Sequence, residues 1–129
     1  MTYEYVVDSY AWIEYFRGTS AGEAARPYLE SDRAATSALT LGELKEKYLR
    51  EKWSWFERDS AFIVNRTQIV NLDKEIALAA GELNHGRKKV MNGWGMADSV
   101  VLATARGASA KVVTGDPHFR DVPEAILIS

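Results

Sequence analysis

Residues 4–18 read EYVVDSYAWIEYFRG, and this stretch decides the fold class. Its β-branched and aromatic start predicts a short strand over Glu4–Val7 that stops at Asp8. The residues that follow, Ser9–Arg17, predict a helix that Gly18 closes. A strand that passes through one acidic residue directly into a helix is typical of α/β proteins.

The alternation of strand and helix continues to the end of the chain. Further strands are expected at Arg33–Ser37, Gln68–Leu72, Lys111–Thr114 and Ala125–Ile128. Further helices are expected at Ala21–Glu30, from Thr40 towards Val64 with a break near Ser54, after an N-cap at Asp73, and at Met96–Ala105. This order predicts an α/β fold with a central, mainly parallel sheet between two helical layers.

Composition excludes several classes of protein. The chain has 129 residues, so residues 1–129 are expected to form a single domain, and 47% hydrophobic with 26% charged residues is ordinary for a globular one. The absence of cysteine excludes a disulfide scaffold, a zinc ribbon and a thiol nucleophile. No apolar run is long enough for a membrane span, and residues 1–5 lack the basic start of a signal peptide, so a cytoplasmic protein is expected. A net charge of −2 means that any contact with nucleic acid needs a local basic patch.

Four acidic residues are predicted to meet at one edge of the sheet. Asp8 ends the first strand and Asp116 follows the strand Lys111–Thr114, so both project from the carboxyl edge where α/β proteins bind ligands. Glu43 is expected in the first turn of the helix after the second strand, and Asp98 near the start of a helix that is otherwise apolar. Each acid alone also fits a helix cap or a favourable helix N-terminus.

Mutual repulsion argues for a cation among these acids. Two unit charges about 5 Å apart repel by about 3 kcal/mol at an effective dielectric constant of about 20. Full ionisation of all four would then cost on the order of 10–20 kcal/mol before screening. Oxygen ligands without histidine or cysteine suit Mg²⁺ or Mn²⁺. Such ions promote hydrolysis of phosphodiester bonds, which is the chemistry that this cluster predicts.

Four motifs carry a resemblance to a known family. They are VVDSYAWIEYF at residues 6–16, TLGEL at 40–44, ADSVVLATAR at 97–106 and VTGDPHF at 113–119. From about Tyr5 to Ile128, the chain resembles the PIN-domain ribonucleases, and among them it looks most like the VapC-type toxins of prokaryotic toxin–antitoxin pairs. The resemblance implies a three-layer α/β/α fold, a Mg²⁺- or Mn²⁺-dependent endoribonuclease that cuts RNA, a homodimer and an antitoxin protein as partner.

The resemblance also implies roles for individual residues. The family's catalytic, metal-binding acids map onto Asp8, Glu43, Asp98 and Asp116, with Glu43 either a direct ligand or one that acts through water. The family's hydroxyl residues map onto Ser9 and Thr114, which are expected to hold a carboxylate or a bound water by hydrogen bonds. Ser9 also fits an ordinary helix start.

Contacts with RNA are less sharply predicted. Arg87 and Lys88 belong to a basic run that would neutralise phosphates, while Trp94 would stack on a base. The alternative for the run is a favourable basic helix C-terminus. His118 and Arg120 follow the last acid closely enough to touch the scissile phosphate.

Other interpretations stay open. Trp53, Trp55 and Phe56 fit a core, a dimer face or an antitoxin groove, and Asp121 fits a solvated loop better than a fifth acid of the site. A phosphoacceptor receiver domain would need an acidic pair before the first helix, and a haloacid-dehalogenase phosphatase would need Asp-x-Asp where this chain has Asp8-Ser9-Tyr10. A non-catalytic PIN-like binding module for protein or RNA is the alternative from another functional class.

Overall fold

The computed structural model describes residues 2–129; Met1, which belongs to the segment expected not to be a signal peptide, lies outside them. The strands are β1 (Tyr5–Val7), β2 (Ala34–Ser37), β3 (Gln68–Val70), β4 (Lys111–Thr114) and β5 (Ala125–Leu127). The helices are α1 (Ser9–Arg17), α2 (Ser20–Leu29), α3 (Ala38–Glu51), α4 (Phe56–Arg66), α5 (Lys74–Arg87) and α6 (Met96–Gly107), with a 3₁₀ turn at Pro117–Phe119. Within residues 2–129, no helix has the length and apolar character that crossing a bilayer requires.

The five strands form one sheet in the order β3-β2-β1-β4-β5, and every neighbouring pair is parallel. The predicted α/β fold with a mainly parallel sheet is confirmed, and the sheet is in fact wholly parallel. This order differs from the 2-1-3-4-5 order of receiver domains, which removes that alternative. The direction of strand succession reverses between β1 and β4, and such switch points are where parallel sheets bind ligands.

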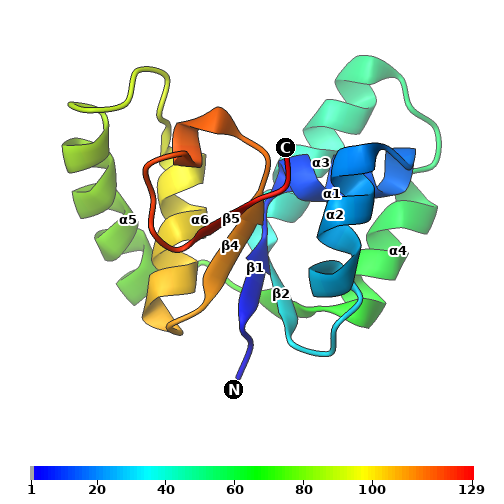
Figure 1. Ribbon diagram of the computed structural model, residues 1–129, viewed down its shortest axis with the longest axis horizontal. Coiled ribbons are helices and arrows are strands. Elements are labelled where there is room, and N and C mark those ends of the chain that lie inside the picture. The colour runs from blue at the N-terminus through cyan, green and yellow to red at the C-terminus, as the bar shows by residue number, and fades with distance from the viewer. Residues whose placement is uncertain (1) are drawn as a thin grey trace.

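Helices cover both faces of the sheet, with α5 and α6 on one side and α1 to α4 on the other (Figure 1). Successive side chains of a strand point to opposite faces of the sheet, so each strand contributes residues to the hydrophobic core on either face. Val6 and Val112 pack in the core beneath α6, whereas Val7 and Val113 pack in the core beneath α1 and α3. The three-layer α/β/α architecture is therefore confirmed.

The boundaries of α1 follow from local chemistry. The Asp8 side chain caps its N-terminus by accepting the Ser9 N–H, and Gly18 ends it with a left-handed φ of 68°. The neighbouring helix α2 packs closely because Gly22 has no side chain. A Cβ at Gly22 would lie 2.2 Å from the carbonyl oxygen of Glu14 in α1.

Two predicted boundaries need correction, the start of α3 and the end of β3. Helix α3 begins at Ala38, capped by the Ser37 hydroxyl, rather than at Thr40, so Glu43 lies in its second turn and not in its first. The predicted break near Ser54 is present, and α3 ends at Glu51. Strand β3 stops at Val70, two residues before the predicted end, and Asp73 caps α5 as expected.

Candidate active site

The four predicted acids line one cavity at the carboxyl edge of the sheet. Its volume is about 310 Å³, and its walls include Asp8, Glu43, Asp98 and Asp116. Asp8 follows β1 and Asp116 follows β4, the two strands that flank the switch point. We call these four residues the acidic cluster.

Asp8 is the most deeply buried member, with 6% of its surface exposed. One carboxyl oxygen accepts the Ser9 backbone N–H at 2.8 Å, and the other accepts the Thr114 hydroxyl at 2.7 Å. The Thr114 oxygen also accepts the Asp116 backbone N–H at 3.0 Å. Thr114 therefore ties together the ends of β1 and β4, and Ser9 contributes its backbone to Asp8.

Burial and crowding shift three of the carboxyl groups towards the protonated form. Burial raises the pKa of Asp8 to about 6 against the hydrogen bonds from Thr114 and Ser9, and nearby carboxylates raise it further. Burial raises the pKa of Glu43 to about 7, helped by repulsion from Asp8 and Asp98. Burial also raises the pKa of Asp98, against the stabilising Gly95 N–H, and Asp116 adds repulsion.

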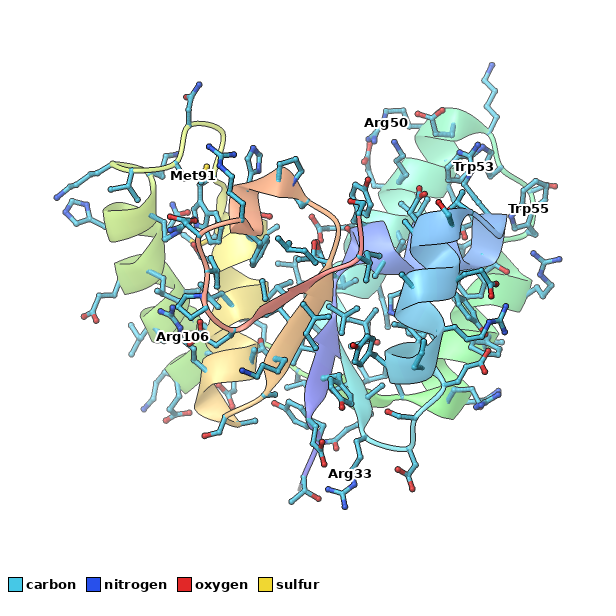
Figure 2. The ribbon with its side chains drawn as sticks, viewed as in Figure 1. Arg33, Arg50, Trp53, Trp55, Met91 and Arg106 are labelled. Atoms are coloured by element: carbon cyan, nitrogen blue, oxygen red, sulfur yellow. The ribbon has the colours of Figure 1, made fainter. Side chains whose placement is uncertain are left out.

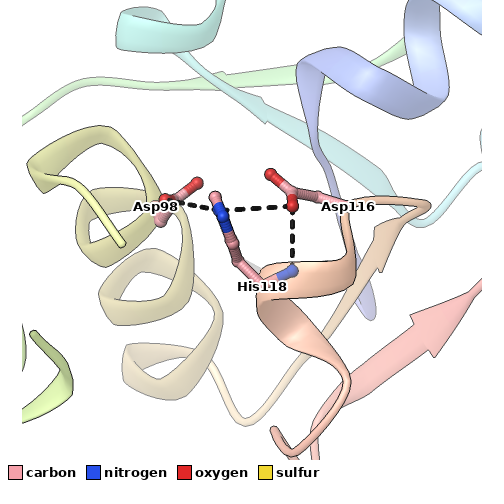
Figure 3. A group of neighbouring side chains, drawn as sticks. All are labelled: Asp98, Asp116 and His118. Atoms are coloured by element: carbon pink, nitrogen blue, oxygen red, sulfur yellow. Dashed lines mark hydrogen bonds and ion pairs between the residues drawn. The ribbon is translucent and has the colours of Figure 1, made fainter. Parts of the chain in front are cut away.

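Asp98 and Asp116 approach each other from opposite sides of one histidine (Figure 3). Asp98 lies in the first turn of α6, where its Oδ2 accepts the Gly95 N–H at 3.0 Å. Asp116 caps the 3₁₀ turn, and its Oδ1 accepts the His118 backbone N–H at 2.9 Å. The His118 Nδ1 lies 3.3 Å from Asp116 Oδ1 and 3.9 Å from Asp98 Oδ2.

The donor set fits a divalent cation. Among residues 2–129, no lysine or arginine forms an ion pair with a carboxylate of the acidic cluster. Asp98, Asp116 and His118 each offer a ligand atom, and these atoms all lie within 4.8 Å of one another. Several carboxylates facing one another are stable when a multivalent cation lies between them.

The predicted RNA contact by Trp94 is wrong. The indole is only 2% exposed, and its N–H donates to the Ser99 hydroxyl at 2.7 Å. Its ring packs against Phe119 with centroids 4.9 Å apart, and the Arg87 guanidinium lies 4.3 Å from the ring centroid. Trp94 therefore belongs to the core beneath α6, and no base can stack on it.

The Arg87 guanidinium makes its contacts within the protein, so it is not free to bind RNA. Its guanidinium forms a bidentate ion pair with Asp121, with both contacts at 2.9 Å, and donates to the His118 carbonyl oxygen at 3.0 Å. Asp121 is an exposed loop acid, as expected, and it is also the partner of Arg87. The neighbouring Lys88 is exposed, as is Arg120, which donates to the Pro117 carbonyl oxygen at 3.3 Å.

Two basic residues that the sequence prediction missed line the acidic cavity. Lys47 and Arg50 lie on the same wall as Glu43, and Arg50 pairs with Glu46. Their spacing from Glu43 is i+4 and i+7, which places all three side chains on one face of α3. That spacing was visible in the sequence and indicates a basic rim beside the acids.

The model of the PIN domain family matches residues 5–125. The chain belongs to the PIN domain family. A search of curated protein sequences finds no match. The matched residues 5–125 include all four members of the acidic cluster.

Solved structures share the fold of this PIN domain along almost its whole length. A toxin–antitoxin complex from Klebsiella pneumoniae is 20% identical, with a TM-score of 0.77 and 98% of each chain covered. DNA-bound VapBC from Salmonella typhimurium is 22% identical, with a TM-score of 0.74, covering 99% of this chain and 100% of the other. A Sarcin-Ricin loop cleaving VapC toxin of Mycobacterium tuberculosis is 15% identical, with a TM-score of 0.77, covering 94% of this chain and 96% of the other.

Proposed function

We propose that this PIN-domain protein is a Mg²⁺- or Mn²⁺-dependent endoribonuclease, the toxin of a type II toxin–antitoxin pair. The observation that carries the proposal is the convergence of Asp8, Glu43, Asp98 and Asp116 on one cavity. Membership of the PIN family and the fold shared with toxin–antitoxin proteins support the same conclusion. In this proposal, residues 1–129 form a single nuclease domain that acts in the cytoplasm.

Asp8, Asp98 and Asp116 are the main metal ligands in this proposal. They come from β1, α6 and the end of β4, so ligands from three separate segments meet at the switch point. When bound, the metal would activate a water and stabilise the charge that develops on the phosphodiester oxygens.

The remaining polar residues of the cavity position these groups. Glu43 lines the cavity together with the three aspartates, and we assign it to the attacking water or to the metal through water. Thr114 fixes the orientation of the Asp8 carboxylate through its 2.7 Å hydrogen bond. The Ser9 hydroxyl lies on the cavity wall and is assigned to a carboxylate or a bound water.

We assign the phosphates of the RNA to the basic rim formed by Lys47 and Arg50. Both side chains line the cavity that holds the acidic cluster, so a backbone laid across it would meet positive charge beside the ligands. The exposed Lys88 and Arg120 lie outside this rim, and we assign them to further contacts with the RNA. This assignment replaces Arg87 and Trp94, whose side chains are used in folding.

An antitoxin protein is the proposed partner, and a groove beside the acidic cavity is its proposed binding site. A cavity of about 190 Å³ is lined by Ile13, Phe16, Arg17, Tyr48, Trp53 and Trp55. Figure 2 shows Trp53 and Trp55 on the connection between α3 and α4. Ile13 lines this groove as well as the acidic cavity, so one bound segment would be able to reach both. The proposed homodimer is tested by sedimentation at micromolar concentration, where a monomer alone would contradict it.

The experiment that tests the function is cleavage of total cellular RNA by the tag-free protein, after any copurified partner has been removed. We expect internal cuts with Mg²⁺ or Mn²⁺ and none with EDTA, and mapping the cut ends identifies the target. A folded protein that binds RNA but leaves it intact with either metal would support the non-catalytic binding module. Inhibition by the product of a neighbouring gene tests the toxin–antitoxin assignment separately.

A further inference from the structure

One nitrogen of His118 is buried without a hydrogen bond. In the part of the chain that the structure describes, Nδ1 has no hydrogen-bond partner, although the side chain as a whole is 33% exposed. Asp116 Oδ1 is only 3.3 Å away, but it already accepts the His118 backbone N–H at 2.9 Å. A buried polar atom without a partner loses its hydration and gains nothing in return, which calls for an explanation.

The imidazole is held in this position from two sides. Gly93 packs against its outer edge, and a Cβ there would lie 2.8 Å from Nε2. Because Gly93 also has a left-handed φ of 88°, a side chain at this position is disfavoured twice. On the backbone side, Arg87 donates to the His118 carbonyl oxygen at 3.0 Å. The ring lies beside the Gly93 backbone with its Nδ1 near both Asp116 and Asp98.

The distances around Nδ1 lie within the range found between ligands of one metal ion. Metal–ligand bonds of about 2.1 Å place neighbouring ligands of an octahedral ion about 3.0 Å apart and opposite ligands about 4.2 Å apart. The separations of Nδ1 from Asp116 Oδ1 and Asp98 Oδ2 are 3.3 and 3.9 Å. An ion near all three atoms would satisfy the nitrogen and offset the repulsion between the two acids.

We propose that His118 Nδ1 is a metal ligand that makes the acidic cluster a mixed oxygen and nitrogen site. This inference rests on the proposed function, because it assumes that the cluster binds a divalent cation. The neutral tautomer with its proton on Nε2 presents the lone pair of Nδ1 to the ion. Mg²⁺ is a hard ion that proteins bind through oxygen ligands, so a nitrogen ligand from His118 disfavours Mg²⁺ and shifts the preference of the site towards Mn²⁺.

The test is electron spin-echo envelope modulation of the tag-free protein loaded with Mn²⁺, together with calorimetric titrations of Mn²⁺ and Mg²⁺. Wild-type protein should show strong modulation from a directly bound nitrogen. His118→Ala should lose that modulation, and its Kd for Mn²⁺ should rise about 10- to 100-fold while the Kd for Mg²⁺ changes far less. His118→Gln keeps a polar side chain of similar length and should also lose the nitrogen signal.

The chain provides a matched control because its other histidine, His85, is exposed on α5. His85→Ala should keep the full nitrogen modulation. Mn²⁺ bound to wild type without nitrogen modulation would overturn the inference and leave the proposed function standing, with Nδ1 then a proton donor to Asp116. Failure of wild type to bind either metal would overturn both.

Discussion

Asp59 and Asp8 are both buried aspartates, but the protein surrounds them very differently. Asp59, in α4, is 2% exposed; it accepts the Tyr48 hydroxyl at 2.6 Å and pairs with Arg58 at 2.9 Å. Asp8 is 6% exposed and also accepts two hydrogen bonds, yet its charged neighbours are the carboxylates Asp98 and Asp116.

This difference distinguishes an acid that stabilises the fold from one that we propose to bind metal. The ion pair with Arg58 and the hydrogen bond from the Tyr48 hydroxyl compensate the burial of Asp59. At the acidic cluster, burial raises the pKa of Asp8 and of Glu43, and the neighbouring carboxylates raise both further. A protein tolerates this arrangement where a ligand of opposite charge supplies the missing stabilisation. Substitutions at the two places should therefore have opposite consequences.

The largest expected effect is on RNA cleavage. Asp98→Asn keeps a side-chain oxygen for the Gly95 N–H but removes a charged metal ligand. We expect cleavage to fall more than about 100-fold, because even the removal of groups that only orient a ligand costs about 10- to 100-fold. Gel assays of purified, metal-loaded variants measure this.

Asp59→Asn is the matched control for that experiment. It should lower stability by about 1–3 kcal/mol through its weakened contacts with Tyr48 and Arg58, yet cleave RNA at nearly the wild-type rate per folded molecule. Equal cleavage by wild type and folded Asp98→Asn would remove Asp98 from the site.

The second prediction concerns stability without metal. The pKa of Glu43 is raised to about 7 in the folded state, so between about pH 4.5 and pH 7 the folded protein binds more protons than the unfolded chain. The contribution of this residue to stability is therefore lost as pH rises through that window. Glu43→Gln should gain stability relative to wild type as the pH increases from about 4.5 to 7.

Urea denaturation of the metal-free proteins at several pH values measures that gain. Asp8 should act in the same direction, because its pKa is raised to about 6, a shift worth about 3 kcal/mol at 1.36 kcal/mol per unit. Adding Mg²⁺ should stabilise wild type more than Glu43→Gln, because the metal binds the ionised cluster. If the difference in stability between the two proteins did not depend on pH, the raised pKa of Glu43 would be contradicted.

The third prediction compares two neighbours in the basic run. Arg87→Ala removes the ion pair with Asp121, the hydrogen bond to His118 and the contact with Trp94, and should lower stability by about 2 kcal/mol or more. Lys88 is exposed, so Lys88→Ala should stay within about 0.5 kcal/mol of wild type. Chemical denaturation measures the stability of both variants. Similar destabilisation of the two would mean that the contacts of Arg87 do not stabilise the fold.

The smallest effect is expected at the basic rim. Removing one side chain that neutralises a phosphate of single-stranded RNA should lower the log–log salt slope of binding by about 0.7. The double variant Lys47→Ala with Arg50→Ala should therefore flatten the slope by about 1.4 if each side chain neutralises one phosphate. Lys74→Ala, at the exposed start of α5, serves as the comparison variant away from the cavity. An unchanged slope in the double variant would mean that Lys47 and Arg50 do not contact the RNA phosphates.

Sequence patterns predicted the fold well because its determinants are local. The strand–acid–helix stretch at 4–18 and the Gly18 stop act within a few residues, and the structure confirms both. Asp8 and Asp116 were placed at one edge by a topological rule that needs only strand order and direction. Helix α3 was predicted two residues late because its Ser37 cap also ends β2.

The features that sequence patterns did not predict depend on contacts between distant segments. Trp94 and Arg87 were predicted to contact RNA because a basic run next to an aromatic residue is typical of RNA-binding surfaces. In the structure, Phe119 and Asp121 from the C-terminal part of the chain pair with them. The approach of His118 to Asp98 likewise joins two segments that no local spacing connects.

The central claim is that the acidic cluster holds a divalent metal, and calorimetric titration of Mn²⁺ into metal-free protein tests it most directly. Wild type and Asp59→Asn should show saturable binding of similar affinity, whereas Asp98→Asn should bind at least about 10-fold more weakly. The same affinity in all three proteins, or no binding to folded wild type, would contradict the account.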